Sequence, residues 1–273
     1  MIQTASPAAL PRLTALLGRA NDAPYDLMRV AEEKLFGRGM AGQPVVRVWS
    51  DDEGLAVTCG RFLRVLAVDR AHRRRGIGTA LLEDAVQLGA RVAFAEPGNY
   101  FLPGVIDPAF FANRGWKETA ATQNMETSAL PTRVPAGVTR ATHAMRERVL
   151  DFIEREFGRI WRFEVTPAFE RASPALFITG DDNVITGFAA HDVNNRGLGF
   201  FGPTGVARTH RGRGLGTRLL QASLADLRRL GYERAVIPWT DAIGFYAKAC
   251  GAAVTQRFVT MTLASPPPHS AAR

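Results

Sequence analysis

Two stretches rich in arginine and glycine have the residue types and the spacing to bind an anion. They read RRRGIGT at 73–79 and RGRGLGT at 211–217, and each stands between an apolar run and a segment with leucines at helical spacing. The amides of a helix's first turn have no intrahelical partner and lie at the positive end of the helix dipole. Glycine lets this backbone approach a phosphate closely, and arginine adds charge and forked donors. The two stretches therefore predict two phosphate-binding loops, with a basic helix cap as the simpler alternative for each.

Other phosphate and metal motifs are absent from the sequence. Neither loop has the GK[ST] of a Walker loop, and neither has GxGxxG followed by an acidic residue at the ribose-binding distance. The two cysteines, Cys59 and Cys250, are far apart and form no CxxC or metal-ligand pattern, so no metal is expected. Both are predicted to be buried as small apolar residues in a reduced, cytoplasmic setting.

The composition is that of a globular protein and predicts neither a nucleic-acid partner nor a membrane partner. The chain has 273 residues, a formal net charge of +8 and 34 basic residues, of which only those at 34, 117 and 248 are lysine. The arginines are spread along the chain without the aromatic interleaving of a single-strand binder. The sequence contains no run of 18 apolar residues and no secretory signal pattern. An anionic small molecule accounts for the local arginine clusters.

The elements around the two loops recur in the same order, which predicts two α/β domains of one architecture. Each half begins with a helical segment and continues with paired strand-like runs around an acidic turn. After the loop and its helix come a short strand and a second helix that ends in aromatic residues and glycine. The matching segments are 9–20 and 142–157, 44–60 and 175–193, 91–97 and 234–239, and 109–116 and 244–252.

The predicted domains are 1–130 and 137–263. Between them lies PTRVPAG at 131–137, which has two prolines, a glycine and no apolar periodicity, as a linker would. The tail ASPPPHSAAR at 264–273 is expected to be disordered.

The sequences around both loops resemble the acyl-CoA-binding segment of the GNAT acetyltransferase superfamily. LRVLAVDRAHRRRGIGTALLEDA (63–85) and GPTGVARTHRGRGLGTRLLQASL (202–224) each carry its [RQ]-x-x-G-x-[GA] signature between a strand and a helix. The likeness covers both halves in order, so the chain resembles a tandem GNAT protein. This implies two GNAT-like domains, each a mixed, mostly antiparallel sheet flanked by helices, and it implies acetyl-CoA as the cofactor.

The resemblance also implies which residues bind the cofactor. In the family, the strand before the loop hydrogen-bonds the pantetheine arm, and the loop amides hold the pyrophosphate. The implied strand contacts are Leu66 and Val68 in the first half, and Gly205 and Val206 in the second. The implied pyrophosphate cradles are Arg73, Arg74, Arg75, Gly76, Ile77, Gly78 and Thr79, and Arg211, Gly212, Arg213, Gly214, Leu215, Gly216 and Thr217.

The family often places a tyrosine in F-Y-x-x-x-G-F, where it protonates the departing thiolate of CoA. The second half supplies Phe245-Tyr246, with Gly251 one residue later than usual, whereas the first half has Phe110-Phe111. The resemblance thus implies Tyr246 as the acid and a catalytic second domain, with aromatic packing as the simpler role for Tyr246. The general base stays open among five residues: Glu154, Glu164, His191, Asp192 and Asp241.

The segment EPGNYFLPGVIDP at 96–108 is either a space-filling loop or a wall of an acceptor pocket, with Asn99 and Tyr100 as polar contacts. The function implied is transfer of acetyl from acetyl-CoA to a primary amine of a small molecule. The likeness of NYFLPGV and WTDAIGFY to tandem GNAT proteins acting on amino sugars favours an amino sugar, with aminoglycosides, polyamines and mycothiol-type precursors also open. The alternative is a non-catalytic acyl-CoA-binding or sensing protein.

Overall fold

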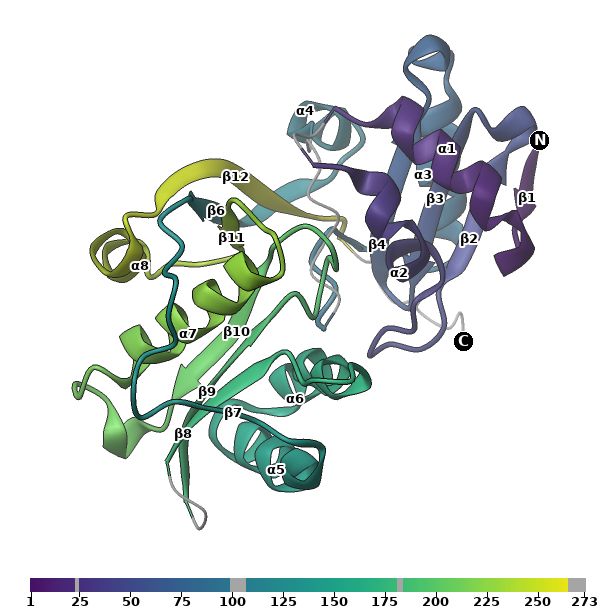
Figure 1. Cartoon of the computed structure of the whole chain (residues 1–273). Helices are drawn as coiled ribbons and strands as arrows, with labels where there is room; N and C mark the ends of the chain where they lie inside the picture. The colour runs from purple at the N-terminus through teal and green to yellow at the C-terminus, as the bar shows by residue number, and fades with distance from the viewer. Residues whose placement is uncertain (23–24, 99–106, 181–183, 265–273) are drawn as a thin grey trace, which may run out of the picture. The chain divides into compact units, whose positions relative to one another are not determined.

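The chain folds into two compact units. The structure, a computed structural model, describes residues 1–22, 25–98, 107–180 and 184–264 (Figure 1). Within these, the first unit comprises 1–96, 107–121 and 258–264, and the second comprises 97–98, 122–180 and 184–257. No helix in the described ranges is long and apolar enough to cross a membrane.

The first unit is a mixed, mostly antiparallel sheet. Strands β1 to β4 pair antiparallel in chain order, β4 pairs parallel with β5, and the order continues through β12 and β6. The strands are β1 (Ile2–Thr4), β2 (Val45–Trp49), β3 (Gly54–Cys59), β4 (Phe62–Val68), β5 (Val92–Ala93), β6 (Lys117–Thr127) and β12 (Ala253–Thr262). The helices are α1 (Leu10–Ala20), α2 (Ala31–Phe36), α3 (Ile77–Gln87) and α4 (Pro108–Ala112).

Helices cover both faces of this sheet because its strands are apolar on both sides. Successive residues of a strand point to opposite faces. In β3, Leu55 and Val57 pack in a cluster with α1, and Ala56 between them packs in a second cluster with α3. Figure 1 shows α1 and α3 on the two sides of the sheet. Because consecutive residues of β3 are all buried, helices pack on both of its faces, which gives three layers.

The second unit repeats this plan. Its antiparallel sheet has the order β10-β9-β8-β7, and a single parallel bridge from Phe200 to Val236 adds β11, which pairs with β6. The strands are β7 (Thr139–Arg140), β8 (Leu176–Gly180), β9 (Ile185–His191), β10 (Phe201–Val206) and β11 (Ala235–Ile237). The helices are α5 (Arg146–Phe157), α6 (Arg159–Val165), α7 (Leu215–Arg229) and α8 (Ile243–Cys250).

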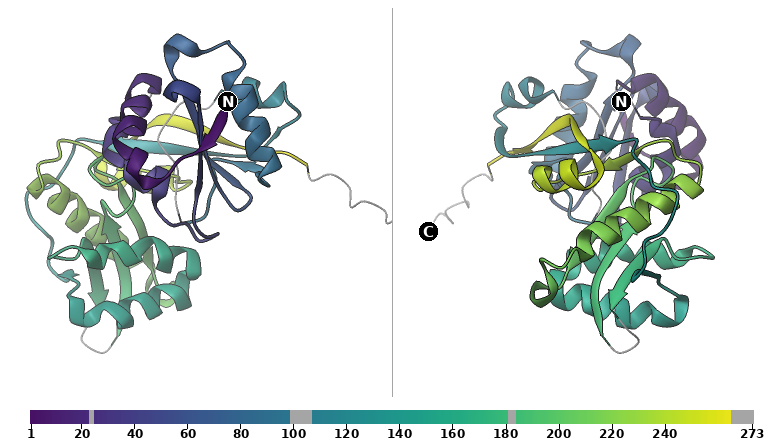
Figure 2. Two further views of the ribbon diagram at one scale, coloured as in Figure 1. Left: turned by 90° about the vertical axis from the view of Figure 1, so that its right-hand side faces the viewer. Right: turned by 60° about the vertical axis from the view of Figure 1, so that its left-hand side comes forward.

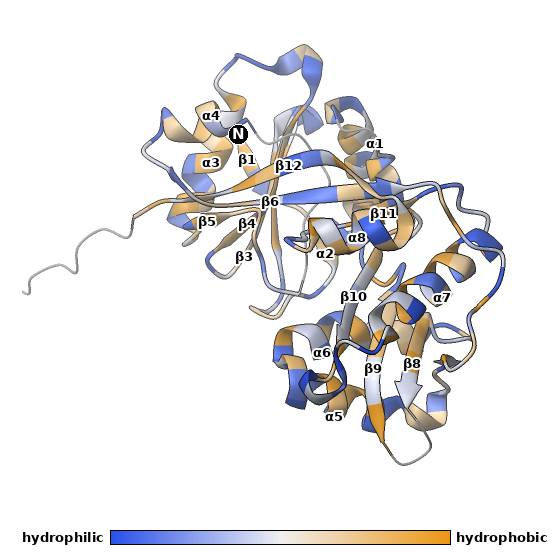
Figure 3. Cartoon of the chain, turned by 90° about the vertical axis from the view of Figure 1, so that its left-hand side faces the viewer, coloured by the Kyte–Doolittle hydropathy of each residue, from blue (hydrophilic) through white to orange (hydrophobic). Residues whose placement is uncertain are grey.

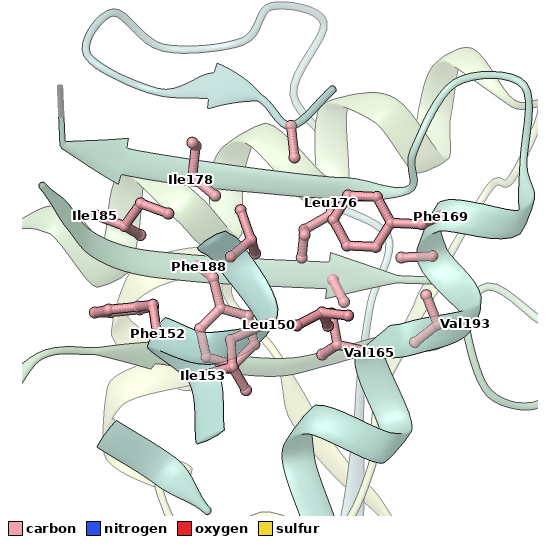
Figure 4. Close-up of a cluster of buried hydrophobic side chains, with 14 of the residues drawn as sticks. Leu150, Phe152, Ile153, Val165, Phe169, Leu176, Ile178, Ile185, Phe188 and Val193 are labelled. Atoms are coloured by element: carbon pink, nitrogen blue, oxygen red, sulfur yellow. The ribbon is translucent and has the colours of Figure 1, made fainter. Parts of the chain in front are cut away.

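The core of the second unit also lies on both faces of its sheet. Helices α5 and α6 bury their apolar sides against β8 and β9, and Figure 4 shows Leu150 and Val165 beside Leu176 and Phe188. Helix α7 covers the other face with a buried leucine stripe. Figure 3 shows orange and blue alternating along α7, as expected for a helix with one buried side.

In each unit the two central parallel strands pair only at one end. Strands β4 and β5 are joined at Phe62 to Val92 and Leu63 to Ala93, and the second unit has only the bridge named above. Both pairings lie at the end of the strand remote from the arginine–glycine loop. The sheet is therefore open on the side from which that loop begins.

Strands β6 and β12 each contribute to both units. Residues 117–121 of β6 lie in the first unit and 122–127 in the second, where Met125 to Thr127 pair with β11. Residues 258–262 of β12 lie in the first unit, where Met261 pairs with Ala93. Within that unit the hydroxyls of Thr119 and Thr262 are 2.9 Å apart, and Figure 2 shows the two strands side by side. Each unit thus completes its sheet with a segment from the other half of the sequence.

The predicted fold class is confirmed, whereas the compact units run differently from the linear domains 1–130 and 137–263. The difference comes from the segment pairings of β6 and β12, which periodicity does not encode. The predicted linker at 131–137 lies between β6 and β7 and contains no helix or strand. In the tail predicted to be disordered, 265–273 lie outside the described residues.

Candidate functional site

The two arginine–glycine loops have the same backbone conformation. Arg73 has φ −64° and ψ 159°, and Arg211 has φ −67° and ψ 162°. Gly76 (φ 82°, ψ −9°) and Gly214 (φ 75°, ψ 2°) are left-handed and cap α3 and α7. Glycine adopts this conformation without the cost that a side chain brings. The sequence repeat is therefore also a structural repeat.

The first arginine of each loop ties the loop to the preceding strand. Its Nε donates to the carbonyl of the last strand residue at 3.1 Å in both units, Arg73 to Val68 and Arg211 to Val206. Arg73 also donates to the carbonyl of Ala20 at 2.7 Å. These contacts give the motif's arginine a structural role in shaping the loop.

The charge of Arg73 is balanced within the first unit. Its guanidinium lies 2.6 Å from the carboxylate of Asp22, which also accepts from Arg70 at 2.7 Å. Burial is the largest single influence and raises the pKa of Asp22, but the hydrogen bonds and charges of the two arginines together outweigh it and lower that pKa overall. Asp22 is thus ionised at neutral pH and neutralises part of the loop's positive charge.

A cavity of about 730 Å³ lies beside the first loop, inside the first unit. Helix α1 contributes Leu17 and Ala20 to its wall, and Phe94 follows β5. Seven of the nine cofactor contacts predicted for this half line it: Leu66, Val68, Arg73, Arg74, Gly76, Gly78 and Thr79. The other two lie elsewhere, since Arg75 is exposed and Ile77 is buried in the core.

One member of a buried ion pair, Arg64, lines the cavity where β4 and β5 stop pairing. Arg64 directly follows the last paired residue of β4, and its guanidinium donates to both oxygens of Glu96 at 2.6 and 2.8 Å. Each residue is only 1% exposed. Arg64 also donates to the carbonyl of Gly37 at 2.7 Å. The pair therefore ties β4 to the chain after β5 and to the end of α2.

The aromatic pairs of the two units occupy matching positions. A side chain on Gly78 would contact the Phe110 ring at 3.5 Å, and one on Gly216 would contact the Phe245 ring at 3.6 Å. The next ring packs edge-on in both units, Phe111 at 5.3 Å from Phe110 and Tyr246 at 4.9 Å from Phe245. Phe111 therefore stands in the first unit where Tyr246 stands in the second.

Tyr246 is packed in the core and protonated. It is 7% exposed and meets the Phe201 ring edge-on at 6.1 Å. Burial, with a smaller effect of Cys250, raises the pKa of Tyr246 to about 12. The residue has both the packing role and the proton that an acid requires.

Gly205 of β10 is required by close packing. A side chain there would lie 2.5 Å from the Phe157 ring, so the ring rests directly on the Gly205 backbone. Phe157 in turn stacks on Trp161 at 5.1 Å. In the predicted second cradle, Gly214 is the N-cap of α7, and Leu215 to Thr217 form the first turn of that helix.

Two of the five candidate bases are buried members of ion pairs. His191 is fully buried and hydrogen-bonds Asp226 at 2.7 Å, and Asp192 lies 2.5 Å from Arg171. Desolvation lowers the pKa of His191 despite the nearby carboxylate. Of the other three, Glu154 pairs with Arg162 at 3.3 Å, Glu164 is buried on α6, and Asp241 is exposed.

The predicted acceptor contacts Asn99 and Tyr100 lie outside the described residues. Sequence reasoning missed four cavity residues with charged side chains: Asp22, Arg64, Asp107 and Arg114. Of these four, only Arg64 had a visible signal, as the single charge in the apolar run 62–68. The others are ordinary surface types in the sequence, and it is the fold that brings them to the loop.

Comparison with known proteins agrees with this arrangement. The model of the acetyltransferase (GNAT) family matches residues 45–97 and 142–252, one match in each half. The chain therefore belongs to the GNAT family, and the predictions of a tandem GNAT protein and of a GNAT-type N-acetyltransferase are confirmed. A search of curated protein sequences finds no match.

Solved structures with the same fold contain two-domain relatives. The glucosamine N-acetyltransferase region of a fungal multi-domain GH3 β-N-acetylglucosaminidase superposes with TM-score 0.72 at 18% identity over 96% of this chain, which spans only 38% of the fungal chain. A GCN5-related N-acetyltransferase from Sphaerobacter thermophilus gives TM-score 0.66 at 21% identity, covering 96% of this chain and 94% of that one. A tandem GNAT protein from the clavulanic acid biosynthesis pathway gives 0.65 at 18% identity, covering 98% and 99%.

Proposed function

We propose that the protein uses acetyl-CoA to acetylate a primary amine of a small molecule. The observation that carries the proposal is the cavity of the first unit, whose wall combines the strand, the loop and the arginines that a CoA ester requires. A cavity of about 730 Å³ is within the usual size of a small-molecule site.

The residues of this cavity fit acetyl-CoA chemically. Leu66 and Val68 would offer backbone groups of β4 to the pantetheine arm. Gly78 and Thr79 belong to the first turn of α3, whose amides have no intrahelical partner and suit a diphosphate. Arg74 lines the cavity as well and would add charge. The matching loop of the second unit, from Arg211 to Thr217, would hold the same group there.

Tyr246 is the proposed acid of the second unit. Bound acetyl-CoA would supply the acetyl thioester. The Tyr246 hydroxyl, which burial keeps protonated, would give its proton to the departing sulfur, and a base would take the proton of the acceptor amine. Phe111 has no such proton, so we place the acid-assisted reaction in the second unit.

An amino sugar is the first acceptor to test. The support is the sequence likeness at NYFLPGV and WTDAIGFY and the name of the fungal relative, a glucosamine N-acetyltransferase region. We propose a small-molecule partner in the cytoplasm, without nucleic acid or membrane. The unpaired, buried state of Cys59 and Cys250 supports a reducing setting.

One observation favours a second function, that of an acyl-CoA sensor. The cavity described above lies in the unit that carries Phe111 in place of the tyrosine. Binding there without turnover would make the first unit an acyl-CoA-binding domain.

Release of CoA thiol separates the two functions. The full chain is incubated with acetyl-CoA and a panel of glucosamine, an aminoglycoside, a polyamine and a mycothiol-type amine precursor, and free thiol is followed. We expect amine-dependent release with at least one acceptor, glucosamine first. Tight binding of acetyl-CoA with no release for any amine would favour the sensor, and absence of binding would contradict both functions.

A further inference from the structure

Arg114 is held at the first loop by three contacts. Its guanidinium donates to the hydroxyl of Thr79 at 2.7 Å and to the carbonyl of Phe110 at 2.6 Å. It also lies over the Phe110 ring, 4.0 Å from the centroid. Stacking and hydrogen bonds of this kind pre-organise an arginine side chain. Arg114 lines the same cavity as the loop.

These contacts leave most of the donors of Arg114 unused. A guanidinium has five N–H groups, and the two hydrogen bonds occupy two of them. Both acceptors are neutral oxygens, so neither balances the positive charge. Among the described residues, no carboxylate forms an ion pair with Arg114, whereas Arg73 has Asp22. The charge and three N–H donors of Arg114 are therefore available to an anionic ligand.

The second unit has no equivalent of this side chain. Arg114 follows Phe110 by four residues, and the residue four after Phe245 is Ala249. Phe245 is accordingly 39% exposed, and among the residues that the structure describes no arginine stacks over its ring. The two loops are alike in backbone, so Arg114 is an addition to the first loop and is not part of the shared repeat.

We propose that Arg114 binds a third phosphate group, the 3′-phosphate on the ribose of coenzyme A. This inference rests on the proposed acetyl-CoA site. The amides of the loop and of the first turn of α3 suit a diphosphate, as argued above. A 3′-phosphate carries additional negative charge and needs a cationic partner outside that turn. Arg114 provides a fork of unused donors next to Thr79. Because this partner is available only to the 3′-phosphate, the first unit binds coenzyme A more tightly than its 3′-dephospho form.

The test compares coenzyme A with 3′-dephospho-coenzyme A by calorimetry on the full chain. Both ligands are measured in the chain that keeps Gly214 and again in a Gly214→Val background, which is meant to remove binding at the second loop. Circular dichroism checks that each variant is folded. We expect coenzyme A to bind roughly 10- to 100-fold more tightly, the usual effect of hydrogen bonds to a charged group. Arg114→Ala should abolish this preference by weakening coenzyme A binding alone. Arg61→Ala, at the other end of β4, makes the same change in charge at an exposed position and should leave both affinities unchanged.

Each other outcome overturns the inference in a distinguishable way. Equal affinities of the unmodified chain for both ligands would show that the 3′-phosphate is not bound. Equal losses for both ligands in Arg114→Ala would assign Arg114 to the diphosphate. If neither ligand binds the unmodified chain, the acetyl-CoA site itself fails and this inference fails with it.

Discussion

At the scale of single residues, Phe111 and Tyr246 differ by one oxygen in matching environments. Both rings are buried and each packs edge-on against the preceding phenylalanine. Tyr246 adds a hydroxyl whose pKa is raised by burial. Phe111 has no hydroxyl, so the acid role proposed above can fall only to Tyr246 of the two.

Tyr246→Phe should leave acetyl-CoA affinity unchanged and lower kcat by roughly 10²–10⁴-fold, the usual contribution of a positioned acid. The ring and its packing are retained, so only the proton is lost. Steady-state kinetics and calorimetry measure the two quantities. A kcat equal to that of the unmodified enzyme, with chemistry rate-limiting, would reduce Tyr246 to packing.

The ionisation of Tyr246 should appear only at strongly alkaline pH. Its folded pKa of about 12 lies above the ordinary value of 10.0 because burial disfavours the phenolate. The resulting contribution to stability is complete below pH 10 and is lost as the pH rises toward 12. Ultraviolet titration of the unmodified chain minus Tyr246→Phe measures this pKa, and a difference signal centred near 10 would contradict the burial argument.

At the scale of elements, a left-handed glycine connects each loop to its helix. Gly214 has φ 75° and open space where a side chain would be, so the backbone conformation alone requires glycine. The same holds for Gly76 in the first loop. The geometry of the helix start, and hence of its amides, depends on these two positions.

Gly214→Val should abolish acetyl-CoA binding to the second loop, because a β-branched residue is strained at positive φ and the first turn of α7 would shift. Calorimetry on the full chain should then show the first loop's binding only. Gly244→Val, a glycine in open space at ordinary φ on α8, serves as the control. If Gly214→Val binds at both loops with full affinity, the cradle assignment of the second loop is wrong.

In the first unit, the ion pair between Arg64 and Glu96 joins two elements, strand β4 and the chain that follows β5. Glu96→Ala should lower the free energy of unfolding by about 3–5 kcal/mol, because it leaves a buried guanidinium without its partner. Urea denaturation measures the change. Glu118→Ala, an exposed carboxylate on β6, should change stability by less than about 0.5 kcal/mol. A similar small effect at Glu96 would mean that water replaces the carboxylate.

At the scale of the whole molecule, the last strand of the chain is part of the first unit's core. Met261 is 1% exposed and lies in one apolar cluster with residues of α3 and α4, from Ile77 to Phe111. These residues are far earlier in the chain, so no local sequence pattern relates them to Met261. Residues 125–127 likewise supply a strand segment to β11. A fragment of residues 137–273 would lack that segment, so we expect it to fold poorly by itself.

Met261→Ala should destabilise the first unit by about 2–5 kcal/mol, the usual effect of truncating a buried methionine. Val254→Ala, at a 46% exposed position of the same strand, should have little effect. Chemical denaturation monitored by circular dichroism compares the two variants. Equal stabilities would contradict the assignment of residues 258–264 to the first unit.

The sequence by itself determined the features encoded in short segments. The two loops, their helices and the aromatic pairs were predictable because each depends on a few neighbouring residues, and the repeat supplied a second copy of the same evidence. The long strands β6 and β12 were not predicted, since their polar, threonine-rich sequences show little apolar alternation.

Only the tertiary structure decided which residues meet at the site. Arg64 and Glu96 are 32 residues apart, and Thr79 and Arg114 are 35 apart, so no local pattern relates them. The cavity beside the first loop and the exchange of strand segments likewise depend on long-range packing. The physical reason is that periodicity reports which face of a segment is buried, whereas the identity of the segment that buries it is determined by the folded chain as a whole.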